Sequence, residues 1–288
     1  MESITGSKNN EKKSLFNLGV REKTILSILA FGFFFIAILI WGSFIKVDNL
    51  YVDLPNKFQT PSLSHLFGTD WVGRDMLTRT IKGLSLSMKI GLLATLTSTI
   101  IAIILGIIGP TFGRRVDAVV TWFIDLVLSV PHTLVVILIS IAMGGGLKGI
   151  VVGVAATHWT SLTRVIRAEV MQIMESDYTK ISKNFGKSNW YIAKEHILPH
   201  VIPQIIVNAV LIFPHAILHE ASVTFLGFGL PPHEPAIGVI LSESMKYLTS
   251  GYWWLAFFPG LSLILVSMMV DKIGKNIEQL INPKTAYK

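Results

Sequence analysis

Residues 86–108 read LSMKIGLLATLTSTIIAIILGII, and Lys89 is the only charged residue in this run. A helix that crosses the ~30 Å hydrocarbon layer of a bilayer needs about 20 mainly apolar residues, and this run is long enough. Comparable apolar runs occur at residues 24–45, 116–143, 149–166, 202–218 and 253–270. The sequence therefore predicts an all-α integral membrane protein with six transmembrane helices.

The composition agrees with a chain that is solvated mainly by lipid. Of the 288 residues, 51% are hydrophobic and 15% are charged, and the mean hydropathy is +0.58. A typical soluble domain carries about 25% charged residues. The lack of cysteine excludes disulfides, thiolate metal sites and a cysteine nucleophile. The net charge of +7 does not predict a nucleic-acid partner, because the basic residues alternate with the apolar runs and form no continuous stripe.

The runs divide the chain into successive parts. We expect a cytoplasmic tail at 1–23, a first transmembrane helix at 24–45, an extracellular segment at 46–85, a five-helix core at 86–272 with a cytoplasmic loop at 167–200, and a second tail at 273–288. The first run is too long for the apolar region of a secretory signal, and no small-residue cleavage site follows it. We therefore expect it to remain in the protein as a span.

The basic residues predict the orientation. With the amino terminus inside, 17 of the 25 Lys and Arg residues fall in cytoplasmic segments and 7 fall outside. Cytoplasmic loops carry the excess of Lys and Arg in membrane proteins. Both termini are therefore predicted to be cytoplasmic.

The loop between the fourth and fifth runs is too polar for lipid and too long for a simple connector. Asp177 can cap a short helix, and Gly186 can end it. Residues 190–192, Trp-Tyr-Ile, restart an apolar face before residues 197–199 lead into the next span. We predict a short helix, a bend and a second helix that lies across the membrane surface. A solvated connector is the alternative.

This loop resembles the cytoplasmic loop of the permeases of ATP-binding-cassette (ABC) importers, which carries a Glu-Ala-Ala triplet, a Gly and an Ile-x-Leu-Pro motif. The triplet is replaced by Lys-Ile-Ser at residues 180–182, whereas Asp177-Tyr178, Gly186 and Ile197-Leu198-Pro199 stand at the family spacing. The resemblance implies that the loop couples the permease to an ATPase. The predicted coupling residues are Asp177, Tyr178, Lys180, Ile181, Ser182, Gly186, Ile197, Leu198 and Pro199.

The segment before the second run, GTDWVGRD at residues 68–75, contains several turn and cap signals. Thr69 or Asp70 can cap a helix, Gly73 permits close backbone approach, and Arg74 can pair with an aspartate. On these residues alone, the segment is a capped external turn. It also resembles the signature of the C-type subunits of dipeptide, oligopeptide and nickel importers, as do Ser222 and the run FLGFG at 225–229. The signature residues are Gly68, Thr69, Asp70, Gly73, Arg74 and Asp75.

The resemblance implies the transmembrane domain of a type I ABC importer in the plasma membrane of a prokaryote. The implied partners are a second homologous permease, two ATP-binding cytoplasmic subunits, an extracellular solute-binding protein and the lipid bilayer. ATP and magnesium belong to the ATPases, since the chain has no Gly-x-x-x-x-Gly-Lys-Ser/Thr loop. We expect no cofactor, catalytic residue or structural metal in this chain.

Three histidines are candidates for the substrate path. His158 lies in the middle of a predicted span, and His215 and His219 share one face of another because they are four residues apart. Ionisable groups at such depth usually face a protein interior or an aqueous path. Two imidazoles at this spacing can bind a borderline metal. Hydrogen bonding inside the bundle is the alternative.

The pairs His158-Trp159 and His215-x-x-Leu218-His219 resemble nickel- and cobalt-type members of the family more than peptide-type members. We therefore predict that this subunit and a second permease form the translocation path for a nickel, cobalt or other transition-metal chelate. Import of di- or oligopeptides by the same machine is the alternative.

Two further classes of function are less favoured. A self-sufficient secondary transporter would need intramembrane carboxylates to bind a coupling ion, and Asp125 is the clear candidate. An intramembrane metalloenzyme would need a second histidine at position 223, four residues after His219, but Val223 stands there.

Overall fold

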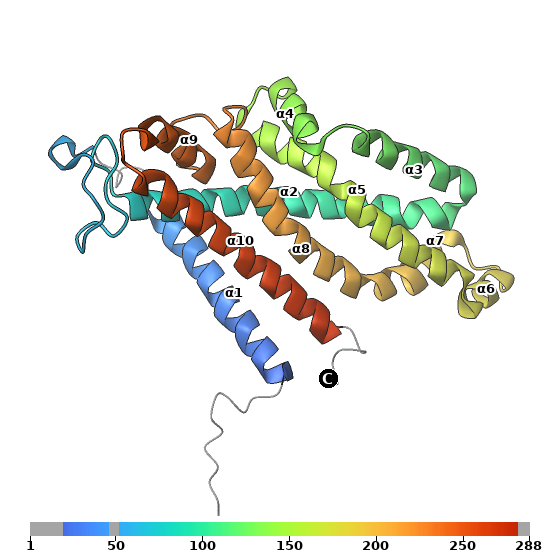
Figure 1. Ribbon diagram of the computed structural model, residues 1–288. Coiled ribbons are helices and arrows are strands. Elements are labelled where there is room, and N and C mark those ends of the chain that lie inside the picture. Colours follow the sequence, from blue (N-terminus) through green and yellow to red (C-terminus); the bar gives the residue numbers. More distant parts are fainter. Residues whose placement is uncertain (1–19, 46–51, 282–288) are drawn as a thin grey trace, which may run out of the picture.

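The computed structural model describes residues 20–45 and 52–281, and within these ranges the chain is a bundle of helices without a β-strand (Figure 1). The prediction of an all-helical protein is therefore confirmed. Residues 1–19 of the tail predicted at 1–23 lie outside the described residues, as do residues 282–288 of the tail predicted at 273–288 and residues 46–51 of the predicted extracellular segment. The helices are α1 (Val20–Phe44), α2 (Met76–Phe112), α3 (Arg114–Leu128), α4 (His132–Ala142), α5 (Gly146–Glu175), α6 (Asp177–Asn184), α7 (Asn189–Ile192), α8 (Leu198–Phe225), α9 (Ile237–Leu248) and α10 (Trp254–Ile281), with a 3-10 turn at Leu54–Asn56 and a π-helical segment at Ala193–Ile197.

The predicted count of six spans is not confirmed. Among the described residues, four helical segments are long and apolar enough to cross a membrane, at 21–44, 76–112, 189–225 and 254–281. The count becomes five if α3 and α4 are taken as one bent span. Helix α5 has 30 residues but is not among them, because polar side chains such as those of Thr157, His158 and Arg164 interrupt its apolar sequence.

The third predicted span, 116–143, is wrong as a continuous helix. Helix α3 ends at Leu128, and α4 begins at His132 after a bend of 91°. Pro131 occupies the position before α4. A proline has no backbone N–H to donate and disfavours helical backbone in the preceding residue, so it separates the two helices.

Helix α2 begins at Met76, inside the segment predicted to be extracellular. Its cap is Asp75, whose Oδ2 accepts hydrogen bonds from the backbone N and the hydroxyl of Thr78, both at 2.8 Å. The cap predicted at Thr69 or Asp70 is therefore wrong. Asp75 satisfies N–H groups that the first helical turn leaves free.

Helix α2 is the central element of the bundle and contacts α1, α3, α5, α8, α9 and α10 (Figure 1). Two of its glycines mark close approaches. A Cβ added at Gly91 would lie 2.7 Å from Ile217 of α8, and one at Gly106 would lie 2.7 Å from Ile166 of α5. Small residues let membrane helices approach closely, and here each glycine makes room for an isoleucine side chain of the neighbouring helix. The positions of α5 and α8 therefore depend on the surface of α2.

The loop predicted between the fourth and fifth spans differs from the expectation in one respect. Helix α6 is the predicted short helix, and Gly186 in the following bend has φ +78°. Residues 189–225, however, form one continuous helical segment that includes α7, the π-helical segment and α8. The separate second helix across the membrane surface is thus wrong, because its residues begin the next long helix.

Candidate functional site

A cavity of about 400 Å³ lies between α4, α5 and α8, and four histidines line it. His132 is the first residue of α4, and His158 lies near the middle of α5. His215 and His219 come from successive turns of α8. The remaining lining side chains are apolar or hydroxylic: Leu128, Thr157, Thr160, Ser161, Leu211 and Ile212.

Three of these imidazoles form a compact cluster. The ring centroids of His132 and His219 are 4.4 Å apart, those of His132 and His158 are 4.6 Å apart, and those of His158 and His219 are 5.3 Å apart. One ring nitrogen from each residue lies within 4.8 Å of the others. His215 lines the same cavity from an exposed position but does not belong to this group. The structure thus brings together His158 and His219, two of the three predicted path residues, and adds His132.

His132 was missed in the sequence because it fell within an apparently unbroken apolar run. The signal was the pair Pro131-His132, since a proline that ends one helix can place the next residue at the start of another. The bend between α3 and α4 then directs the first turn of α4 towards α5 and α8, where His132 contacts the other two rings.

Hydrogen bonds orient His158. Its Nδ1 lies 3.0 Å from the carbonyl oxygen of Val154. Because a carbonyl oxygen only accepts, Nδ1 carries the proton and Nε2 keeps a free lone pair. The Nδ1 of His132 is buried and has no hydrogen-bond partner among the described residues. The cluster therefore contains one imidazole with a fixed tautomer and one with an unsatisfied ring nitrogen.

Glu220 and Asp125 do not line this cavity. Glu220 is fully buried, and its Oε1 accepts a hydrogen bond of 3.0 Å from the hydroxyl of Thr224. Asp125 is exposed and pairs with Arg164 of α5 at 2.8 Å. Asp125 is thus not a buried, free carboxylate of the kind that a coupling ion would require.

Helix α6 and the bend after it carry an exposed apolar surface. Tyr178, Ile181 and Phe185 are 47%, 54% and 79% exposed, respectively, and Trp190 at the start of the next helix is also exposed. We call Tyr178, Ile181 and Phe185 the α6 patch. Large apolar side chains gathered at one place on a surface mark an interaction site.

The α6 segment is tied to the ends of α5 and α8. Ser182 on α6 lies 3.2 Å from the Nε2 of His196, near the start of the long helix. Ile192 and Ile197 are fully buried and share a core cluster with Ile173 of α5. Among the predicted coupling residues, Tyr178 and Ile181 are exposed. Ile197, at the start of the long 189–225 segment, is buried in the bundle. Helix α6 itself contacts the end of α5 and the start of the 189–225 segment.

The signature segment is organised around Asp70, which is fully buried. Its carboxylate accepts hydrogen bonds from the side chains of Arg74 and Arg79 at 2.7 and 2.9 Å and from the backbone N–H groups of Val72 and Arg74. Arg79 also donates to Glu243 of α9 at 2.7 Å. The predicted pairing of Arg74 with an aspartate is confirmed, and the network joins the external segment to α2 and α9.

The other signature residues shape the same segment. Thr69 donates its hydroxyl to the carbonyl of Asn56 and accepts from the backbone N–H of Gln59. Gly68 and Gly73 have φ +72° and +85°, and a Cβ at Gly73 would lie 1.8 Å from the carbonyl oxygen of Asp53. These contacts give the signature a structural role at the end of the bundle opposite α6 (Figure 1).

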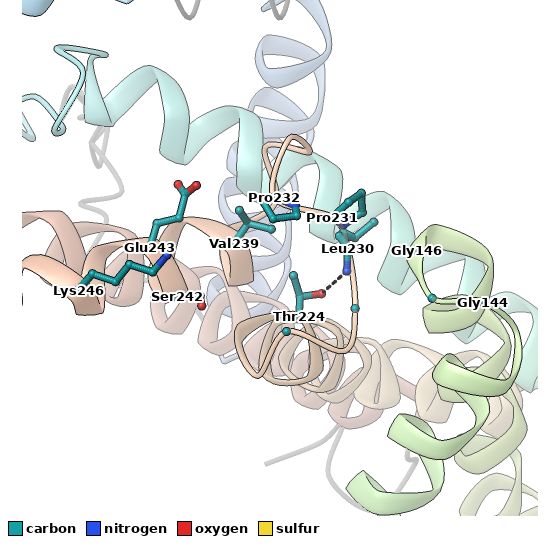
Figure 2. Close-up of a pocket in the computed structure, with 13 residues that line it drawn as sticks. Gly144, Gly146, Thr224, Leu230, Pro231, Pro232, Val239, Ser242, Glu243 and Lys246 are labelled. Carbon is teal, nitrogen blue, oxygen red and sulfur yellow. Dashed lines mark hydrogen bonds between the residues drawn. The ribbon is translucent and has the colours of Figure 1, made fainter.

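A second cavity, of about 420 Å³, lies near this end between the α4–α5 turn, the loop after α8 and α9 (Figure 2). Glycines 144–146 line one side, while Glu243 and Lys246 of α9 contribute charges. The hydroxyl of Thr224 accepts a hydrogen bond from the backbone N–H of Leu230 at 3.3 Å, which holds the loop after α8 (Figure 2). Of the FLGFG run at 225–229, Gly227 and Gly229 line this cavity.

Comparisons with known proteins agree with this architecture. The sequence model of the family described as "Binding-protein-dependent transport system inner membrane component" matches residues 98–283. The dipeptide transport system permease protein DppC of Bacillus subtilis is 34% identical over 224 residues, which cover 78% of this chain and 70% of the relative. The oligopeptide transport system permease protein OppC of the same organism is 31% identical over 241 residues, covering 84% and 79%.

Solved structures share the fold at low sequence identity. A structure of the inward-facing MetNI methionine ABC transporter has a TM-score of 0.54 at 14% identity and covers 70% of this chain and 97% of that chain. An amino acid ABC transporter with histidines has a TM-score of 0.55 at 15% identity, with coverage of 71% and 95%. The type I ABC importer fold is thus confirmed.

The curated relatives named above are peptide permeases, so the predicted closeness to the nickel and cobalt type is not shown. Permease subunits of ABC importers carry no cofactor and are not enzymes, because the partner ATPases use the ATP. The family model matches more than half of the chain, so the chain belongs to the family of binding-protein-dependent transport system inner membrane components. It is therefore a membrane-spanning permease subunit of an ABC importer.

Proposed function

We propose that this chain and a second, homologous permease form the path by which an ABC importer takes up dipeptides or other short peptides. The observation that carries the substrate class is the 34% and 31% identity to dipeptide and oligopeptide permeases over most of the chain. An extracellular solute-binding protein and two cytoplasmic ATPases complete the proposed machine. It lies in the plasma membrane of a prokaryote with both termini in the cytoplasm.

The α6 patch is the proposed docking site for an ATPase. Tyr178, Ile181 and Phe185 are exposed apolar side chains. Helix α6 is too short and polar to span a membrane, so these side chains suit contact with a protein partner and not with lipid. Closure of the ATPases on ATP would shift α6, and the shift would pass through buried Ile173 and Ile197 to α5 and α8. Such a rigid-body displacement of packed helices is a common basis for alternating access.

The translocation path is proposed to run beside α4, α5 and α8, where the histidine-lined cavity opens. Exposed apolar residues on α2 and α10, such as Ile100, Ile104 and Met268, suit contact with lipid or with the second permease. In this arrangement, substrate released by the binding protein enters at the end that carries the signature segment and leaves at the end that carries α6.

A transition-metal chelate is the second candidate substrate, and one observation favours it. Four histidines line a single cavity, and three of them place ring nitrogens within 4.8 Å of one another. Imidazole is a preferred ligand for nickel, cobalt and zinc. A peptide path alone gives no reason for this clustering.

The ATPase activity of the assembled importer tests the choice between these substrates. The importer is reconstituted in nanodiscs, and its binding protein is loaded in turn with a dipeptide, an oligopeptide or a nickel–chelator complex. The proposal expects the dipeptide- or oligopeptide-loaded binding protein to stimulate ATP hydrolysis most strongly. Stimulation by the nickel–chelator complex alone would contradict the peptide proposal and favour the second candidate.

A further inference from the structure

We propose that His132, His158 and His219 together bind one divalent ion of the nickel, cobalt and zinc class inside the permease. The binding follows from the arrangement of the three side chains, whereas its interpretation as a substrate site rests on the proposed importer function. The ion would be held on its way through the chain, either alone or with a small chelating molecule attached.

The spacing of the three donors suits a shared ion. Nitrogens that bind zinc at about 2.0–2.1 Å in tetrahedral geometry lie about 3.4 Å apart. The three ring nitrogens already lie within 4.8 Å of one another, so small side-chain rotations bring them into range. Because His132, His158 and His219 belong to α4, α5 and α8, a bound ion would connect three helices.

Both His158 and His132 have a ring nitrogen that is free to bind a metal ion. The hydrogen bond from His158 Nδ1 to the carbonyl of Val154 leaves Nε2 with its lone pair and limits rotation of the ring. Such a backbone carbonyl partner is common behind metal-binding histidines. In the part of the chain that the structure describes, the buried Nδ1 of His132 has no hydrogen-bond partner, and proteins rarely leave such an atom unsatisfied. Metal binding would satisfy it.

The cavity also selects the class of ion. Among the described residues that line it, none carries a permanent charge, so no Lys or Arg repels a cation and no carboxylate is offered. Calcium and magnesium prefer oxygen ligands, most often carboxylates. Imidazoles without carboxylates favour the borderline transition metals instead.

Three protein ligands leave one position of a tetrahedral ion open. A zinc site with this pattern keeps the fourth position for water or substrate. For the open position, the same cavity offers His215, one helical turn from His219. Either His215 or a donor atom of an incoming chelator can occupy it. A short peptide has amine and carbonyl donors, so a peptide path and a metal site are chemically compatible.

Equilibrium binding of Co²⁺ to the complete importer in nanodiscs, without nucleotide or binding protein, tests the proposal. Co²⁺ bound by imidazoles in tetrahedral geometry absorbs visible light strongly, and Ni²⁺ and Zn²⁺ are added as competitors. The variants are His132→Gln, His158→Gln, His219→Gln and the triple variant. His233→Gln is the matched control, because His233 is exposed in the loop before α9 and outside the cluster.

We expect the wild-type importer to bind one Co²⁺ more than the triple variant. Each single Gln substitution should weaken that binding at least about 100-fold, since even residues behind a metal ligand contribute 10–100-fold to affinity. His233→Gln should bind as the wild type does. Equal stoichiometry and affinity in the wild type and the triple variant would overturn the proposal.

A second measurement covers variants that fail to assemble. The wild-type importer is treated with diethylpyrocarbonate with and without Zn²⁺, and modification of each histidine is followed by mass spectrometry. We expect Zn²⁺ to protect His132, His158 and His219 but not His233, and equal modification in both conditions would refute the site. Neither measurement requires transport, so failure of the peptide proposal and failure of the metal site give separate results.

Discussion

Asp70 and Arg79 form a buried ion pair in which Oδ2 accepts a hydrogen bond from Nη1 at 2.9 Å. Asp70 lies in the external segment, and Arg79 lies in the first turns of α2. Arg79 extends the network to Glu243 of α9, 164 residues further along the chain. Two elements that follow each other in sequence are thereby fixed to one that comes much later. This end of the bundle, opposite α6, depends on the pair.

The first prediction is that Asp70→Asn destabilises the permease. The substitution leaves the buried guanidinium of Arg79 with one charged partner fewer, and breaking a buried ion pair costs about 3–5 kcal/mol. We expect a clear fall in the melting temperature of the detergent-solubilised complex. Asp53→Asn is the control, because Asp53 is exposed in the same segment and its replacement should cost no more than about 0.5 kcal/mol. Equal melting temperatures for the two variants would show that the pair contributes little.

The second prediction concerns Gly186 in the bend after α6. A Cβ added there meets no other heavy atom within 4 Å in the described part of the chain, its two neighbours aside, but the backbone has φ +78°. This conformation costs a residue with a side chain roughly 1–2 kcal/mol, and asparagine tolerates it better than valine does. Gly186→Val should therefore reduce stimulation of the ATPases, while Gly186→Asn should retain most of it. If both variants lose ATPase stimulation equally, the backbone explanation is wrong. The loss would then come from contact of the added side chain with the ATPase.

The third prediction is that Ile181→Asp in the α6 patch weakens binding of the ATPases. Placing a charge in the centre of an apolar interface removes a contact that can contribute about 2 kcal/mol, or roughly 30-fold in affinity. Co-purification of the ATPases with the permease pair measures the effect. The permease itself should remain folded, because Ile181 is exposed.

Leu63→Asp is the matched control for that substitution. Leu63 is 98% exposed in the external segment, on the opposite side of the membrane in the proposed orientation. The control should leave ATPase binding unchanged. Normal ATPase binding by Ile181→Asp would remove the α6 patch from the docking surface.

The fourth prediction fixes the orientation. The native chain has no cysteine, so a single introduced thiol reports its own position. A cysteine at exposed Ser64 should react with a membrane-impermeant reagent in intact cells, and one at exposed Lys183 should react only after the cells are opened. The reverse pattern would contradict the orientation inferred from the distribution of basic residues.

The helical class and most of the long helices could be predicted because apolar runs report lipid contact directly. The break between α3 and α4 was not, since hydropathy gives Ser129-Val130-Pro131 no special weight in an apolar run. Pro131 is the sequence signal for the break, because a proline disfavours helical backbone in the residue before it. This signal outweighs the continuous hydropathy. The same oversight concealed His132, whose place in the cluster exists only because the chain bends there.

The sequence indicated which types of interaction occur around residues 68–79, but not which residue makes each one. The external segment does cap a helix with an aspartate, but Asp75 and not Asp70 is the cap. The hydrogen-bond donors that the structure shows to Asp70 lie within nine residues of it, but the link from Arg79 to Glu243 of α9 spans 164 residues and has no local signal. The short helix α6 and the bend at Gly186 could be predicted, by contrast, because both depend on adjacent residues. No contact with a residue distant in sequence was required for this prediction.

Uptake of a radiolabelled dipeptide into proteoliposomes tests the central claim most directly. The liposomes contain this chain and the second permease, with or without the two ATPases, and the binding protein is added outside with ATP inside. The account predicts uptake only when the ATPases, the ATP and the binding protein are all present. Uptake by the permeases alone, or uptake that does not change when ATP is omitted, would contradict it.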